Sequence, residues 1–173
     1  MWFPLAQTDL DYTRVSPFRL NFEGEVDAPP ERVFEVFTSD DMRTFFPDVK
    51  RMRWTSEPPR GEGSTRIVTL KMLAVKERFL IWQPGERVTF RIEACSLPLV
   101  KAMMEDFRIH KVGKSRSRID YTIHYTPSLI VRAVHPLARA IFGKMFRDVV
   151  KGVTKMAERT PSKTNGVTAR ASV

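Results

Sequence analysis

The strongest constraint on the fold is a run of six segments, between residues 49 and 126, in which apolar and polar side chains alternate. A period of two residues is typical of a β-strand that buries one of its faces. We expect strands at residues 49–55, 64–73, 75–82, 87–95, 103–112 and 118–126. Short turns with Pro, Gly and charged residues separate several of them, as at residues 83–86, so neighbouring strands pair as antiparallel hairpins.

The segment before this run adds one strand and two short helices. Residues 18–26 alternate in the same way and predict a first strand. Residues 27–37 then change to helical spacing after two prolines, and residues 40–46 form a second short helical segment that Pro47 ends. The sheet is therefore interrupted once, between its first and second strands.

The segment after the run has the pattern of a long amphipathic helix. Between residues 128 and 159, apolar side chains recur three and four positions apart and fall on one arc. A proline inside a helix removes a hydrogen bond, so the long helix either starts or kinks at His135-Pro136. The arc consists of Val134, Leu137, Ala138, Ile141, Met145, Val149, Gly152, Val153 and Met156.

Length and composition are those of one soluble domain. The chain has 173 residues, 42% of them hydrophobic, and a formal net charge of +9. Cys95 is the single cysteine, which excludes an internal disulfide and favours a reducing cytoplasm. We expect a folded domain at residues 18–159 and a disordered basic tail at residues 160–173, and the sequence does not decide whether the leader at residues 1–17 is ordered.

Several local sequences resemble one protein superfamily in their order and spacing. Residues 26–34 resemble its strand-to-helix junction, and residues 46–49 resemble its step into the second strand. Further likenesses lie at residues 61–65, 77–88 and 118–121. The chain thus resembles the START-related SRPBCC superfamily, which includes the birch pollen allergen. It most resembles the bacterial polyketide cyclase/dehydrase and lipid transport branch, over about residues 18–159.

The resemblance implies an α+β helix-grip fold. In this fold a seven-stranded curved antiparallel β-sheet wraps around a long C-terminal α-helix, with two short helices between strands 1 and 2. A cavity for an apolar ligand lies between sheet and helix, and we expect the missing side chain of Gly152 to leave space there. The expected lining residues are Phe79, Ile81, Phe90, Ile92, Glu105, Phe107, Ile109, Tyr121, Ile123, Tyr125, Ile141, Met145, Val149, Gly152 and Met156.

Two functions fit this expectation, and the sequence leaves both open. The first is binding or transport of a hydrophobic small molecule, such as a lipid, isoprenoid, sterol or polyketide, without a cofactor. The second is a polyketide aromatase/cyclase or dehydrase, in which Glu77, Glu105 or a tyrosine positions or protonates the substrate. Both glutamates alternate in phase with apolar neighbours. A buried carboxylate needs a partner or a raised pKa, so each is either a ligand anchor or half of a structural pair.

Other chemistries have little support in the sequence. His110, His124 and His135 lack the spacing of metal ligands, and Cys95 is expected to be a small buried apolar residue. Nucleic acid is disfavoured because no aromatic residues interleave the basic ones. The basic side of the long helix is either simply solvated or makes peripheral contact with an anionic membrane, through Arg139, Lys144, Arg147, Lys151 and Lys155. The oligomeric state stays open.

Overall fold

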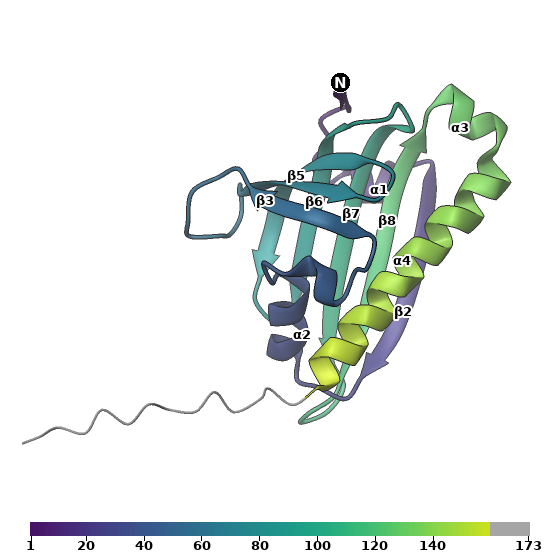
Figure 1. Ribbon diagram of the computed structural model, residues 1–173. Coiled ribbons are helices and arrows are strands. Elements are labelled where there is room, and N and C mark those ends of the chain that lie inside the picture. Colours follow the sequence, from purple (N-terminus) through teal and green to yellow (C-terminus); the bar gives the residue numbers. More distant parts are fainter. Residues whose placement is uncertain (160–173) are drawn as a thin grey trace, which may run out of the picture.

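A curved antiparallel sheet wraps around one long helix in the computed structural model, which describes residues 1–159 (Figure 1). The strands are β1 (Phe3–Pro4), β2 (Phe18–Val26), β3 (Val49–Trp54), β4 (Thr65–Leu70), β5 (Ala74–Gln83), β6 (Arg87–Cys95), β7 (Val100–Lys111) and β8 (Ser117–Pro127). Their order in the sheet is β2-β8-β7-β6-β5-β4-β3, with β1 paired to β6. This is the predicted helix-grip fold. The predicted tail at residues 160–173 lies outside the described residues.

The additional strand, β1, belongs to the leader. Strand β7 pairs with β6 only as far as Arg91, and β1 pairs with the next part of β6, at Ala94 and Cys95. The leader continues between the two strands, because the Leu5 amide donates to the carbonyl of Glu93 and the Ala6 amide donates to that of Lys101. Residues 1–6 therefore fill the gap that opens where β6 and β7 diverge.

The helices follow the predicted order with three differences. Helix α1 (Tyr12–Val15) lies in the leader, and α2 (Pro30–Phe37) follows β2. The second short helix, expected at residues 40–46, is a single 3₁₀ turn, η1 (Met42–Thr44). Helix α3 (Leu129–Ala133) precedes the long helix α4 (His135–Glu158), so the chain starts a new helix at His135 instead of kinking there.

Two glycines bring the C-terminal half of α4 close to its surroundings. A Cβ atom at Gly152 would overlap the carbonyl oxygen of Phe45 and lie 2.7 Å from its carbonyl carbon. On the other side, a Cβ atom at Gly24 of β2 would lie 2.8 Å from Cγ1 of Val150. Because backbone cannot move aside as a flexible side chain can, Gly152 is needed for close packing. The expected free space at Gly152 is therefore absent.

The N-terminal half of α4 stands less closely against the sheet. Phe142 and Met145 are only partly buried, whereas Val149, Val150 and Val153 are at most 4% exposed. The helix is thus held firmly at its C-terminal end and leaves space beneath its first turns. None of the helices in residues 1–159 has the length and hydropathy needed to cross a membrane.

The close contact at Gly152 predicts opposite effects for two alanine substitutions in α4. Gly152→Ala should lower the free energy of unfolding by about 1–3 kcal/mol, because the added methyl group forces α4 away from Phe45. Gly143→Ala, which meets no atom within 4 Å, should raise it by about 0.5–1 kcal/mol through helix propensity. Urea unfolding of both variants measures this, and equal effects would show that Gly152 is not in tight contact.

Candidate ligand cavity

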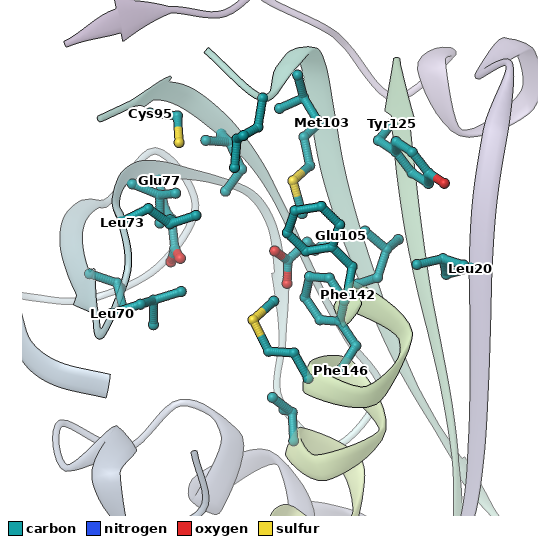
Figure 2. A pocket seen from close by; sticks show the side chains of 18 of the residues that line it. Leu20, Leu70, Leu73, Glu77, Cys95, Met103, Glu105, Tyr125, Phe142 and Phe146 are labelled. Atoms are coloured by element: carbon teal, nitrogen blue, oxygen red, sulfur yellow. The ribbon is translucent and has the colours of Figure 1, made fainter. Parts of the chain in front are cut away.

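A cavity of about 90 Å³ lies between the concave face of the sheet and α4. Figure 2 shows the carboxyl groups of Glu77 and Glu105 pointing into it from the sheet, and Phe142 and Phe146 reaching into it from α4. The lining is otherwise largely apolar. It consists of Leu20, Phe37, Met42, Phe45, Phe46, Arg66, Val68, Leu70, Leu73, Val75, Glu77, Phe90, Ile92, Cys95, Leu99, Val100, Met103, Glu105, Tyr121, Ile123, Tyr125, Val131, His135, Ala138, Arg139, Phe142, Met145, Phe146 and Val149.

About half of the residues expected from the sequence lie in this wall. They come from β6, β7 and β8 and from the middle of α4. These residues are Phe90, Ile92, Glu105, Tyr121, Ile123, Tyr125, Met145 and Val149.

Three other expected residues lie in the solid core. Phe107 stacks on Phe37 of α2 with ring centroids 3.8 Å apart, so the helix covers it. Phe79 packs against Trp82 and Phe90, at 4.9 Å and 5.3 Å between centroids. Ile109 is also buried outside the cavity wall.

The remaining four expected residues lie elsewhere for identifiable reasons. A register shift between Phe79 and Ile81 brings Trp82 to the side of Phe79, so Ile81 leaves the inner face. Ile141 is 58% exposed, on the outer side of α4. Met156 packs against the core near the end of that helix, and Gly152 lies against Phe45.

Among the lining residues that the sequence did not single out, two groups stand out. The first group is Phe37, Met42, Phe45 and Phe46, from the short helices and the segment after them. Their helical spacing showed that they are buried but not which surface they cover. The second is Arg66, which alternates in phase with Val68 and Leu70. The sequence does hold a signal for Arg66. It is a basic residue on an otherwise apolar face of its strand, and the next strand has an acidic residue, Glu77, on its own apolar face.

Arg66 and Glu77 form a buried ion pair in the wall. They face each other across β4 and β5, and Arg66 Nε donates to Glu77 Oε2 over 2.5 Å, with side chains 1% and 6% exposed. The guanidinium also lies over Phe79, 4.9 Å from the ring centroid. Breaking such a pair leaves an uncompensated buried charge, which costs about 3–5 kcal/mol. The pair is therefore fixed in place.

Glu105 lies beside this pair and is held by a neutral partner. The Tyr121 hydroxyl, from β8, donates to Glu105 Oε2. Burial and then the negative charge of Glu77 raise the pKa of Glu105 to about 8, although Tyr121 and Arg66 act in the opposite direction. Burial and the neighbouring Glu105 also raise the pKa of Tyr121 well above its ordinary value of 10. At pH 7 both side chains are protonated.

Arg66, Glu105 and Tyr121 carry hydrogen-bond donors, Glu77 accepts, and the four side chains together add no net charge. The charges of Arg66 and Glu77 cancel, and Glu105 and Tyr121 are neutral. Within residues 1–159, Nη1 of Arg66 is buried and has no hydrogen-bond partner, and an unsatisfied buried donor is costly. We call Arg66, Glu77, Glu105 and Tyr121 the polar cluster. It is suited to a neutral oxygen atom at the end of an apolar molecule.

The other potentially reactive groups near the cavity form structural contacts or have low reactivity. The Tyr125 hydroxyl and His135 Nε2 lie 2.8 Å apart, which joins β8 to the start of α4. Burial raises the pKa of the Cys95 thiol, so it is a weak nucleophile. Among the described residues, no three His, Cys, Asp or Glu side chains are grouped to hold a metal ion.

The raised pKa of Glu105 predicts a pH-dependent stability that one substitution removes. The folded protein holds this proton more tightly than the unfolded chain, so the stabilisation is complete below about pH 4.5 and is lost as the pH rises to about 8. Relative to Glu105→Gln, the wild-type free energy of unfolding should fall by up to about 1.4 kcal/mol per pH unit in this window. Urea unfolding of both proteins from pH 5 to 9 measures the difference, and parallel curves would contradict the shift.

Comparison with known proteins agrees with this architecture. Residues 18–158 match the family described as polyketide cyclase/dehydrase and lipid transport. An uncharacterized protein of Mycobacterium tuberculosis is 31% identical over 112 residues, which cover 64% of this chain and 67% of that protein.

Two solved structures share the fold. The Zhui aromatase/cyclase from Streptomyces sp. R1128 has a TM-score of 0.73 at 16% identity, over 87% of this chain and 99% of the other. A START superfamily protein from Mycobacterium smegmatis has a TM-score of 0.69 at 12% identity, over 81% of this chain and 97% of the other. At these identities the likeness shows the fold and not the activity.

Proposed function

The chain belongs to the polyketide cyclase/dehydrase and lipid transport family, and from this premise we propose that it binds a hydrophobic small molecule in the cavity between the sheet and α4. The observation that carries the proposal is the polar cluster at the wall of an otherwise apolar cavity. A core that served only stability would gain little from four buried polar side chains, because a buried ion pair is often no more stable than apolar packing. A cytoplasmic location is part of the proposal and rests on the single cysteine.

The size of the cavity indicates that the wall moves when a large ligand enters. Sites for drug-sized molecules usually enclose about 300–1,000 Å³, more than the 90 Å³ found here. Met103 and Met145 line the cavity and are partly buried, and methionine side chains adapt readily to a new shape. Movement of these side chains and of the loosely packed half of α4 would widen the cavity while Gly152 holds the other half.

The polar cluster favours a neutral polar group on the ligand. A ligand carboxylate would bring an uncompensated negative charge beside Glu77 and Glu105, at a desolvation cost of several kcal/mol. A ketone, ester or hydroxyl oxygen would accept from Arg66 Nη1 without that cost. We therefore propose ligands such as isoprenoids, sterols, neutral lipids or polyketides, with one such oxygen at the polar cluster.

Two alanines of α4 provide a matched test of cavity binding. Ala138 lines the cavity, whereas Ala140 is exposed on the outer side of the helix. Ala138→Phe should fill the mouth of the cavity and weaken binding of a neutral, apolar fluorescent probe, such as Nile red, by at least about tenfold. Fluorescence titration of the two variants and the wild type measures this.

The control variant decides the interpretation. Ala140→Phe should bind the probe as the wild type does, because its side chain points away from the cavity. If both variants bind equally well, or if the wild type does not bind the probe, the cavity is not the binding site. Unfolding curves for each variant separate a blocked cavity from a damaged fold.

A second function, acid catalysis on a polyketide, is favoured by one observation. A carboxyl group with a pKa of about 8 keeps its proton at neutral pH and can donate it to a substrate carbonyl or leaving hydroxyl. The sequence left Glu77, Glu105 and a tyrosine as candidates for this role. The ion pair with Arg66 engages Glu77, so Glu105 is the candidate acid.

Glu105→Gln separates catalysis from binding. If Glu105 is an acid, the variant should lose at least about 100-fold in the rate of cyclisation or dehydration of a poly-β-keto thioester, while it still binds the substrate. The wild-type rate should fall above about pH 8 as Glu105 ionises. A wild-type protein that binds the thioester and leaves it unchanged would reject catalysis and leave binding as the function.

A further inference from the structure

Five large apolar side chains are exposed together on α3 and the first turns of α4. Their exposed fractions range from 51% to 73%, and they are Leu129, Ile130, Val134, Leu137 and Ile141. Val134, Leu137 and Ile141 are three and four positions apart and share one face of the helix. We call these five residues the apolar face. Clustered apolar exposure of this kind usually marks an interaction site.

The apolar face is distinct from the face of α4 that covers the cavity. Ala138, Phe142 and Met145 line the cavity, whereas Leu137 and Ile141 are 64% and 58% exposed. The sequence placed Ala138 and Met145 on the same arc as Leu137 and Ile141. The structure separates them, so this part of α4 is apolar on two sides and packs only one of them. Figure 1 shows α3 and these first turns at the margin of the molecule, at the far end of α4 from α2.

The charged residues that lie near the apolar face in the sequence are all basic. Between Asp120 and Asp148 the sequence has no acidic residue, whereas it has Arg132, Arg139, Lys144 and Arg147. A groove of about 490 Å³ between β2 and α4 is lined by both Arg139 and Arg147, together with the small residues Ala140 and Gly143. Exposed apolar side chains beside such cations complement a surface with an apolar interior and anionic headgroups.

The apolar face also adjoins the mouth of the cavity. The lining residues with solvent exposure lie around the turn before β5, the connection from β6 to β7, and the start of α4. Within the described residues, Arg139 is the one lining residue that is exposed instead of buried or half-buried. The same helical turns thus border the cavity on one side and carry the apolar face on the other.

We propose that the apolar face docks on an anionic lipid bilayer, with its side chains in the headgroup region and the exposed cations Arg132 and Arg147 on lipid phosphates. Docking there places the cavity mouth at the membrane, where an apolar ligand is dissolved. This differs from contact along the whole basic side of α4, because Lys151 and Lys155 lie toward its other end and Lys144 already pairs with Asp148 over 2.7 Å.

Two valines with similar exposure test the apolar contribution. Val134 is 51% exposed in the apolar face, and Val112 is 58% exposed in the turn at the opposite end of β8. Co-sedimentation uses the full chain and vesicles of equal parts phosphatidylcholine and phosphatidylglycerol. Val134→Glu should bind at least about tenfold more weakly than the wild type, and Val112→Glu should bind as the wild type does. If Val134→Glu is poorly folded by circular dichroism, Leu137→Glu replaces it.

Two pairs of charge substitutions test the cationic contribution. Arg132→Gln with Arg147→Gln should reduce binding to these vesicles and abolish the preference over pure phosphatidylcholine, whereas Lys151→Gln with Lys155→Gln should not. Wild-type binding should also fall with rising salt.

Three results would overturn the proposal. They are no binding by the wild type, an equal loss in Val112→Glu and Val134→Glu, and a dimer in sedimentation that Val134→Glu dissociates while vesicles are not bound. Probe binding in the cavity needs no vesicle, so the cavity function is tested separately.

Discussion

The buried ion pair between Arg66 and Glu77 constrains everything around it. Two charges removed from water must remain paired, so β4 and β5 must keep the register that places these residues opposite each other. The same pair determines the state of Glu105, because the charge of Glu77 adds to burial in raising its pKa. Glu105 then keeps its proton and shares a hydrogen bond with Tyr121. An apolar cavity thus acquires one polar wall with no net charge.

The long helix covers this wall unevenly, and the unevenness creates the cavity. Gly24 and Gly152 allow backbone and side chains to approach the C-terminal half of α4 to distances that a Cβ atom would prevent. The N-terminal half has no such contact, and its inner side chains face free space. The end of α4 that can move therefore also borders the cavity mouth and carries the apolar face. Ligand entry and surface contact would then involve the same few turns.

The sequence predicted the architecture well because its evidence is local. Alternation in β7 and β8 placed Glu105 and Tyr121 on the inner face, and Pro136 located the start of α4 within one residue. The predictions failed where contacts between residues far apart in the sequence determine the structure. A register shift in β5 displaces Ile81, and Phe45 occupies the space expected at Gly152. Arg66 was missed because Ile67 and Val68 make both phases of its strand apolar. The helical spacing of the apolar residues likewise could not show that Leu137 and Ile141 are exposed.

The central claim is that the polar cluster faces a ligand and has no net charge. Competition between two molecules of equal chain length, dodecan-2-one and dodecanoate, for the fluorescent probe at pH 7 tests it most directly. The ketone should displace the probe at a concentration at least about tenfold lower, because the carboxylate would be buried without a counter-charge. Equal or stronger displacement by dodecanoate would contradict the claim and show that Arg66 serves as the counter-ion of an acid.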